Sequence, residues 1–337
     1  MIQDGIKKII QREDLSETEM SAVMSEIMSG EATDAQIGAF MGALATKGET
    51  FEELAGAART MRRKAARIQV TSPVIVDTCG TGGDRKGTFN ISTTAAFVVA
   101  GCGVTVAKHG NRSVSSQCGS ADLLEALGMR LDAPAEVVEE AIGRIGIGFL
   151  FAPLFHGAMR HAARARKEVG VRSIFNMLGP LTNPAGANCQ VLGVYAPQLT
   201  EMFAQALRLL GARRAFVVHG QDGLDEISVC APTRVSELDG GLVRTYDLQP
   251  ELLLGRKADP EDLAGGDPGV NAKITRDVLG GAIGPRRDVV VLNAAAALIA
   301  AGAAEGFPSA VRNAEESIDG GKAIEKLEAL VRYTNEN

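Results

Sequence analysis

The chain has 337 residues and a formal net charge of −6, with 45% apolar, 23% charged and 4% aromatic residues and no tryptophan. This length is enough for a large core and for two domains. A nucleic-acid surface needs a basic face and usually stacking aromatics, so the composition argues against one. A small anionic substrate remains compatible with it, because a handful of converging cations can bind one whatever the net charge.

Neither targeting segments nor metal or disulfide frameworks are indicated. The N-terminus has no sustained apolar core or cleavage site, and no apolar run approaches the ~20 residues that span a bilayer, so we expect a cytoplasmic protein without a membrane segment. The cysteines are irregularly spaced and the four histidines are scattered, which predicts no disulfide framework and no zinc site. The cysteines expected to be reduced are Cys79, Cys102, Cys118, Cys189 and Cys230.

Residues 1–70 are predicted to be helical. Gly30 and Gly48 stand where two of these helices should end. The basic run 62–67 closes the last helix, either as a solvated end favoured by the helix dipole or as a phosphate contact. Three capping boxes mark helix starts, namely Ser16 with Glu19, Thr33 with Gln36 and Thr50 with Glu53.

From Pro73 onward, short β-type runs alternate with helical stretches, which predicts a mostly parallel, helix-flanked sheet. A hairpin over 235–246, with Asp239-Gly-Gly at its centre, should add to this sheet. The last long apolar run has two interpretations, a buried helix over 289–304 or a strand over 288–292. The β candidates are 74–77, 104–107, 147–151, 189–195, 215–219 and 288–292.

The expected fold is therefore α/β, with a small N-terminal helical domain and a larger α/β domain. We place the helical domain at residues 1–70 and the α/β domain at 71–337. Residues 156–183 are again helical and end at Gly179-Pro180, so they could pack back on the N-terminal helices.

A glycine-rich loop, Asp77-Thr-Cys-Gly-Thr-Gly-Gly-Asp84, connects the first β candidate to a helical run over 92–100. Glycines let the backbone turn tightly and aim several N–H groups at an anion, and the helix N-terminus adds partial positive charge. The loop is neither a dinucleotide fingerprint nor a Walker A loop. Asn90 could instead simply cap the following helix, and this role is compatible with phosphate binding.

A second polar loop, 108–116, follows the next β candidate. Lys108 offers a point charge for phosphate, and Arg112 could make a bidentate contact. His109 is either a ligand or a buried histidine at a strand end. Hydroxyls of Ser113, Ser115 and Ser116 resemble phosphate donors, and Gly119-Ser120 opens another helix. Because ligands bind at the carboxyl ends of strands in such sheets, loops 78–88, 108–116 and 219–226 predict one polyphosphate pocket.

Asp225 and Glu226 are adjacent carboxylates after a β run, which suits Mg²⁺ shared with substrate phosphates, although a charged surface turn is the alternative. In the helical stretch near residue 160, the residues alone do not choose among Arg160, Arg164, Arg166 and Arg172.

These segments together resemble the anthranilate phosphoribosyltransferase family over essentially the whole chain. The resemblance rests on motifs in the family's order: DTCGTGGD, TFNIST (88–93), KHGNRSVSS, GSAD (119–122), RSIFNMLGPLTNP (172–184) and the GLDE pair. It implies a pentosyltransferase of tryptophan biosynthesis that moves the phosphoribosyl group of 5-phosphoribosyl-1-pyrophosphate (PRPP) to anthranilate. It further implies a homodimer built through the helical domain and two Mg²⁺ ions per subunit.

The resemblance also assigns roles to residues of this sequence. Ser92, Asp225 and Glu226 would hold Mg²⁺. Anthranilate would meet Gly80, Asn111 and Arg166, with His109, His156 and Pro180 lining its path. PRPP would bind at Gly80, Gly83, Asp84, Thr88, Asn90, Ile91, Ser92, Thr93, Lys108, His109, Gly110, Asn111, Arg112, Ser113, Val114, Ser115, Ser116 and Ser120.

Two departures from the family pattern are visible. Gln117-Cys118 stands where the family more often has Lys-Ser, and Val270 replaces a commonly acidic position. The first could weaken PRPP affinity. The competing interpretations are a pyrimidine nucleoside phosphorylase, which usually has a further C-terminal domain, and a non-catalytic relative that binds nucleic acid, which would need a basic groove.

Overall fold

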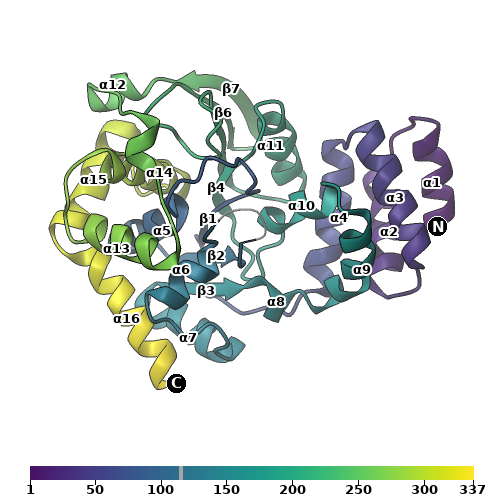
Figure 1. The fold of residues 1–337 in the computed structure, drawn as a ribbon, viewed down its shortest axis with the longest axis horizontal. Helices are drawn as coiled ribbons and strands as arrows, with labels where there is room; N and C mark the ends of the chain where they lie inside the picture. Colours follow the sequence, from purple (N-terminus) through teal and green to yellow (C-terminus); the bar gives the residue numbers. More distant parts are fainter. Residues whose placement is uncertain (114–116) are drawn as a thin grey trace.

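The computed structural model describes residues 1–113 and 117–337. A group of helices at one end stands beside a sheet that is wrapped by other helices (Figure 1). The first helices are α1 (Ile2–Ile10), α2 (Glu17–Met28), α3 (Asp34–Lys47) and α4 (Phe51–Lys64). All three predicted capping boxes form, at the N-termini of α2, α3 and α4. Each is a local bond between residues three apart, so it forms wherever the helix does.

Two later helices join this group. Helix α9 (Arg160–Val169) packs against α3 and α2, and α10 (Ile174–Leu178) packs against α4. Their buried side chains, such as Ala162 and Ile174, belong to the same apolar cluster as Phe40 on α3. The two-part fold is thus confirmed, and the packing of this later segment on the N-terminal helices is observed. The exact boundary near residue 70 stays a prediction.

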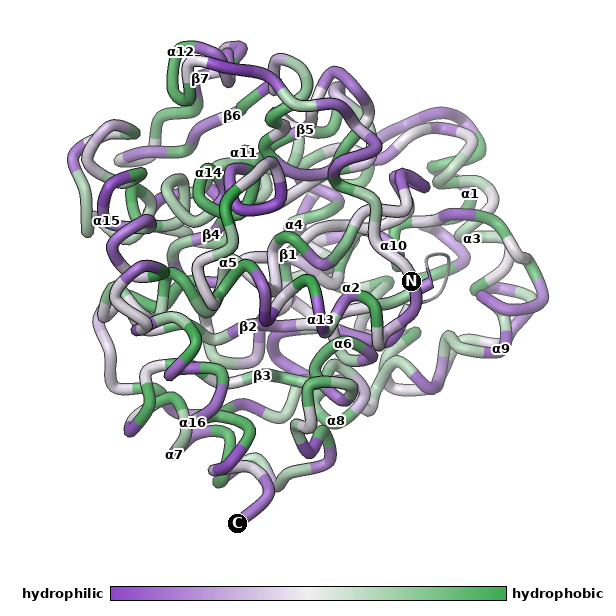
Figure 2. Tube along the Cα trace, turned by 60° about the vertical axis from the view of Figure 1, so that its left-hand side comes forward, coloured by the Kyte–Doolittle hydropathy of each residue, from purple (hydrophilic) through white to green (hydrophobic). Residues whose placement is uncertain are grey.

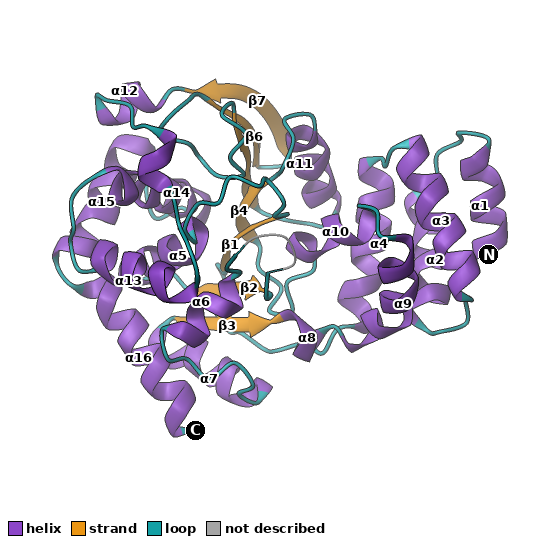
Figure 3. Ribbon diagram, viewed as in Figure 1, coloured by secondary structure: helices purple, strands orange, loops and turns teal. Residues whose placement is uncertain are grey.

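Within the described residues, seven strands form one sheet in the order β3-β2-β1-β4-β5-β6-β7. Figure 3 shows this sheet with helices around it. The first five in that order run parallel, and β6 and β7 add an antiparallel hairpin at the edge. The mostly parallel sheet and the hairpin are therefore confirmed. The strands are β1 (Val76–Gly80), β2 (Val106–Gly110), β3 (Ile147–Phe151), β4 (Cys189–Gly193), β5 (Arg214–Gly220), β6 (Thr233–Asp239) and β7 (Leu242–Leu248).

Both faces of the sheet are buried, which matches the continuous apolar runs of its parallel strands. Val191 on β4 faces α5 (Ile91–Gly101) and α14 (Pro285–Ala301), and its neighbour Leu192 faces α11 (Leu199–Leu209). This alternation places one core under each layer of helices. The remaining helical segments are α6 (Ser120–Ala126), α7 (Ala135–Ile145), α8 (Ala152–Phe155), η1 (Gly157–Met159), η2 (Gly179–Leu181), α12 (Pro250–Leu254), η3 (Pro260–Leu263), α13 (Pro268–Leu279), α15 (Phe307–Asp319) and α16 (Lys322–Glu336).

The strand predicted at 288–292 is wrong, because these residues lie inside α14. Its mostly apolar run continues through Ala301, and the helix is buried from Val289 to Ala300. Figure 2 shows how hydrophobic and hydrophilic residues are distributed along the chain. A short apolar window cannot separate a buried helix from a buried strand, and the length of the run decides. In the described part of the chain, no helix is both long and apolar enough to cross a membrane.

The basic run at the end of α4 joins the two parts of the molecule. Arg62 is half-buried, and its Nε donates to the carbonyl of Leu181 at 2.7 Å. Arg59 Nη2 donates to the carbonyl of Leu209, at the end of α11, at 2.8 Å. Burial lowers the pKa of Arg62 to about 10. The interpretation of this run as a solvated helix end is therefore wrong for Arg62, whose guanidinium binds carbonyl groups across the junction.

Candidate active site

The three polar loops predicted to form a pocket follow β1, β2 and β5, whose carboxyl ends lie at one edge of the sheet. Two hydrogen bonds connect them directly. The N–H of Gly82 donates to Asp225 Oδ2 at 3.2 Å, and the N–H of Ser92 donates to Glu226 Oε1 at 3.1 Å. The glycine loop, the start of α5 and the carboxylate pair therefore meet, although more than 130 residues separate them in sequence.

Glycines allow the close approach of these loops. A Cβ at Gly80 would lie 2.9 Å from Asp225 Oδ2, and a Cβ at Gly193 would collide with the Asp225 carbonyl oxygen. Gly83 has φ of +81°, and a side chain there would also collide with the guanidinium of Arg172. Because Gly80 and Gly193 have no side chains, the loop that carries Asp225 can lie directly against the ends of β1 and β4.

Three carboxylates concentrate negative charge at this point. Burial and the charge of Asp84 raise the pKa of Asp225, and burial and the charge of Asp225 raise the pKa of Glu226. Asp84 Oδ2 is buried and has no hydrogen-bond partner within residues 1–113 and 117–337. A hard divalent cation such as Mg²⁺ would neutralise the repulsion among these three carboxylates and give Asp84 Oδ2 a partner.

The residues present thus fit a Mg²⁺ ion that takes further ligands from outside the protein. Across the described residues, no three His, Cys, Asp or Glu side chains already converge as a ligand set. Mg²⁺ usually keeps several waters and uses one or two carboxylates together with substrate phosphates, so a complete protein cage is not required. Ser92 adjoins the carboxylates through its N–H, as the third predicted metal residue.

Lys108 is buried at the end of β2, and its Nζ donates to the carbonyl of Thr78. Burial lowers its pKa, while the charges of Asp77 and Glu226 oppose that effect. Asp77, to which the sequence motifs gave no role, is fully buried and accepts from the N–H of His109 at 3.1 Å and from Asn183 Nδ2 at 2.8 Å. The Asp77 carboxylate therefore holds the carboxyl end of β2 in place through the N–H of His109.

His109, His156 and Pro180 lie together, as residues that share one path would. The two Nε2 atoms are 3.2 Å apart, and His109 Nδ1 is 3.2 Å from the carbonyl oxygen of Gly179. Pro180 is buried, and its carbonyl accepts from Gln190 Nε2. Burial and the neighbouring imidazole lower the pKa of His109 to about 3, and burial lowers that of His156 to about 4. Both rings are neutral at pH 7.

The structure separates the four arginines that the sequence left equivalent. Arg160 is exposed, and Arg164 is ion-paired with Glu168 at 2.8 Å. Arg172 stacks on the Tyr195 ring, 3.8 Å from its centroid. The guanidinium of Arg166 is half-buried 5.5 Å from the Phe175 ring centroid, and it makes no hydrogen bond or ion pair with any other described residue.

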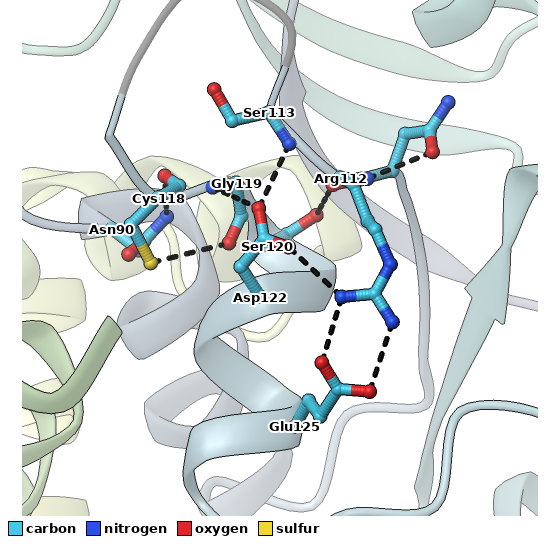
Figure 4. Close-up of polar contacts among 9 residues, drawn as sticks. Asn90, Arg112, Ser113, Cys118, Gly119, Ser120, Asp122 and Glu125 are labelled. Carbon is cyan, nitrogen blue, oxygen red and sulfur yellow. Dashed lines mark hydrogen bonds and ion pairs between the residues drawn. The ribbon is translucent and has the colours of Figure 1, made fainter. Parts of the chain in front are cut away.

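The second polar loop is closed by Asp122 and Glu125, to which the sequence analysis gave no individual role (Figure 4). Asp122 Oδ2 accepts from the N–H groups of Ser113 and Gly119, both at 2.9 Å. Arg112 makes a two-pronged pair with Glu125, at 2.7 and 2.9 Å, and also donates to Asp122. Its guanidinium thus already has carboxylate partners. Val114, Ser115 and Ser116 lie outside the described residues.

Other predicted residues fall around the same edge. Thr88 forms a β-bridge with Ala264. Ile91 and Thr93 are buried in the first turn of α5. Asn111 Oδ1 accepts from the N–H of Arg112 at 2.8 Å, and its carbonyl accepts from Ser120 Oγ at 3.3 Å. Gly110 allows Ser120 to pack against the chain, since a Cβ there would collide with its hydroxyl.

Both parts of the chain match known protein families. Residues 3–65 match the glycosyl transferase family helical bundle domain, and residues 72–324 match the glycosyl transferase family a/b domain. Anthranilate phosphoribosyltransferase from Desulfosudis oleivorans is 70% identical over the full length of both chains. The chain belongs to the anthranilate phosphoribosyltransferase family. The fold class and the resemblance stated above are thereby confirmed.

Solved members of this phosphoribosyltransferase family have the same fold. The crystal structure of the Thermus thermophilus enzyme is 46% identical, covers 98% of this chain and 99% of its own, and superposes with a TM-score of 0.93. The Saccharomyces cerevisiae enzyme, in complex with PRPP and Mg, is 29% identical, covers 100% of this chain and 98% of its own, and has a TM-score of 0.90. The whole chain therefore takes the architecture of this family of transferases.

Three residues that the sequence analysis discussed, Asn90, Gln117 and Val270, have defined places in this phosphoribosyltransferase. Asn90 stands at the N-cap of α5 without a side-chain capping bond, so the capping prediction is wrong. Its Nδ2 instead donates to the carbonyl of Cys118 at 3.0 Å. Gln117 is exposed, and Val270 lies on the surface at the start of α13. Neither departure from the family pattern displaces a predicted ligand that the structure describes.

Proposed function

We propose that this protein transfers the 5-phosphoribosyl group of PRPP to the amine of anthranilate, releasing pyrophosphate, in tryptophan biosynthesis. The observation that carries the proposal is its 70% identity, over both full lengths, to an enzyme named for this activity. The meeting of the glycine loop, the carboxylate pair and Lys108 at one sheet edge supports it. The site offers phosphate and cation ligands for such a transfer, which implies no covalent enzyme intermediate.

PRPP would lie over the glycine loop and the N-terminus of α5, where backbone N–H groups and the helix dipole favour phosphate. Asp225, Glu226 and Ser92 would hold Mg²⁺, and two ions per subunit are part of the proposal. When bound, Mg²⁺ neutralises charge that grows on the departing pyrophosphate. The yeast relative, solved in complex with PRPP and Mg, supports Mg²⁺ as the ion that accompanies PRPP.

Anthranilate would be held by Arg166, whose half-buried guanidinium has no carboxylate partner among the described residues. A planar guanidinium can bind a carboxylate through two parallel hydrogen bonds, which lysine cannot imitate. An aromatic amine is uncharged at neutral pH, so no strong base is needed before it attacks C1 of the ribose. Neutral His109 and His156 suit the path of this substrate, because they add no charge that would compete for its carboxylate. The enzyme's part is then alignment of the two reactants.

The test is the loss of anthranilate fluorescence when the purified protein is mixed with PRPP, with and without Mg²⁺. A loss that requires both PRPP and Mg²⁺ is the expected result. A folded protein that binds PRPP but leaves anthranilate unchanged would contradict the proposal. The homodimer and the cytoplasmic location stay predictions.

A further inference from the structure

Asn271 is a buried asparagine that the proposed chemistry leaves without a role. It lies in α13, 181 residues from Asn90, and only 1% of it is exposed. Its Oδ1 accepts from the N–H of Gly266 at 2.8 Å, and its Nδ2 donates to Asn90 Oδ1 at 3.0 Å. Burying an amide costs free energy of desolvation, which these hydrogen bonds offset. Removing the amide would leave its buried partners without a hydrogen bond.

The backbone determines which way both amides point. The N–H of Gly266 can only donate, so the atom of Asn271 that faces it is the oxygen. The Nδ2 of Asn271 must then face Asn90, whose oxygen accepts. The Nδ2 of Asn90 is left to donate to the Cys118 carbonyl at 3.0 Å, as Figure 4 shows. A chain of bonds thus runs from α13 through the start of α5 to the turn before α6, and Asn271 also hydrogen-bonds the Cys118 side chain directly.

A second set of hydrogen bonds runs from the same face of α13 to Asn90. Thr275 is fully buried, and it stands one helical turn after Asn271. Its Oγ1 lies 3.1 Å from Thr94 Oγ1, which donates to the Asn90 carbonyl at 3.0 Å. Because the Thr94 hydroxyl has one hydrogen, Thr275 must be the donor in their bond. Both the side chain and the carbonyl of Asn90 are therefore tied to α13.

The chain before α13 holds residues 87–89 as well. The N–H of Phe89 donates to the Leu263 carbonyl at 3.2 Å, and the N–H of Gly265 donates to the Gly87 carbonyl at 2.9 Å. A Cβ at Gly265 would lie 2.7 Å from both Asn271 Oδ1 and Phe89 N. Only a glycine at position 265 lets the chain lie this close to Phe89 and Asn271. Residues 263–275 therefore contact residues 87–90 through several backbone and side-chain bonds.

We propose that residues 263–275 form a positioning element for PRPP binding, in which Asn271, acting through Asn90, holds the start of α5 in register with the Cys118-Gly119 turn. The inference rests on the proposed function, since Asn90 and the residues of both loops are proposed PRPP ligands. Asn271 itself contacts no substrate. Without it, Asn90 loses its fixed orientation, and PRPP binding must order the two loops at a cost in affinity.

The experiment measures PRPP affinity by calorimetry, in Mg²⁺ and without anthranilate. Asn271→Ala should weaken PRPP binding about tenfold, the equivalent of one buried hydrogen bond. Asn271→Asp should weaken it at least as much, because an acceptor then faces Asn90 Oδ1 and turns the Asn90 amide away from Cys118. Thr275→Val removes only the hydrogen bond to Thr94, and it should weaken PRPP binding by a smaller factor.

Asn188→Ala is the matched control. This asparagine also binds backbone groups, the N–H of Ile75 at 3.0 Å and the carbonyl of Pro73 at 2.9 Å, at the opposite edge of the sheet. It should lower the melting temperature and leave PRPP affinity unchanged. A fall in affinity equal to that of Asn271→Ala would reduce the effect to general destabilisation and overturn the inference.

A double-mutant cycle separates positioning from a merely structural role. In the Asn90→Ala background, Asn271→Ala should cause a much smaller further loss of PRPP affinity, since most of its effect passes through Asn90 and only its bond to the Cys118 side chain remains. Full additivity would overturn the inference. If Asn271→Ala does not fold, Asn271→Asp replaces it in the cycle. Unchanged PRPP affinity in Asn271 variants would refute the inference alone, whereas intact PRPP binding without anthranilate turnover would refute the proposed function alone.

Discussion

His156 donates its Nε2 hydrogen to His109 Nε2, and the two nitrogens lie 3.2 Å apart. The tautomers follow from a carbonyl: Gly179 O can only accept, so His109 Nδ1 carries the hydrogen of its neutral ring and its Nε2 is free to accept. The rings meet edge to face with centroids 5.0 Å apart. A proton added to His109 would have to break this bond, which agrees with the lowering of its pKa to about 3.

This pair should make the protein less stable in mild acid. Both histidines have lowered pKa values in the folded state, about 3 and about 4, so the unfolded chain binds more protons below the usual histidine pKa of 6.5. Their contribution to the free energy of unfolding is complete above pH 6.5 and is lost as pH falls through 4 toward 3. Thermal unfolding of the wild type and of His109→Gln with His156→Gln across this range tests it. A slope of melting temperature against pH that is the same in both proteins would contradict the prediction.

Arg166→Gln should raise KM for anthranilate and leave KM for PRPP near its wild-type value. Loss of a desolvated charge pair costs roughly 2–5 kcal/mol, and the half-burial of Arg166 places the expected cost toward the lower end. Arg166→Lys should not restore binding, because an ammonium cannot form two parallel bonds. Arg164→Gln, on the exposed pair with Glu168, is the control and should change neither constant. An unchanged KM for anthranilate in Arg166→Gln would remove Arg166 from the site.

Local patterns predicted the parts of the fold that depend on neighbours in sequence. Ser16, Thr33 and Thr50 begin helices because each capping box closes within four residues. The hairpin turn at Gly240-Gly241 has positive φ at both positions, as glycine favours. The strand prediction for 288–292 failed because its strand-like composition continues into a longer apolar run, whose length favours the buried helix that packs against α5 and β4.

The sequence predicted which loops form the candidate site, but it did not predict the hydrogen bonds that hold these loops in place. Polar residues after strands located Asp225 and Lys108, since parallel strands bring their carboxyl ends together. Asp77 and Asn183 gave no such signal, because their partners are fixed by tertiary contacts. The burial of Arg166 between helices likewise has no local signature, and the family resemblance, rather than the residues, selected it.

Mg²⁺ should stabilise the protein more at pH 8 than at pH 6. Burial and the charge of Asp84 raise the pKa of Asp225, and burial and the charge of Asp225 raise that of Glu226, so without a cation the folded state holds protons that the unfolded chain releases. Stability then falls as pH rises from the usual carboxyl range toward pH 8. Bound Mg²⁺ removes this penalty, and its effect is measured as the melting temperature with Mg²⁺ and with a chelator.

Asp225→Asn with Glu226→Gln should abolish both the Mg²⁺-dependent rise in melting temperature and Mg²⁺-dependent turnover. Without Mg²⁺ this double variant should be more stable than the wild type at pH 8, because two buried like charges are gone. Asp222→Asn, in the same loop but bonded to Ser228, is the control for general effects of charge removal. A normal Mg²⁺ titration of the double variant would refute the metal assignment.

Glu125→Gln should lower KM for PRPP by a few-fold. Arg112 is a proposed phosphate ligand, yet its guanidinium is paired with Glu125 at 2.7 and 2.9 Å, so binding must exchange one partner for another. The pair is exposed and therefore weak, which limits the gain. Asp122 is left intact, since it also accepts the N–H groups of Ser113 and Gly119. Asp132→Asn, on the exposed pair with Arg130, is the matched control and should leave KM unchanged. A rise in KM for PRPP would mean that Glu125 holds Arg112 in its binding position instead of competing for it.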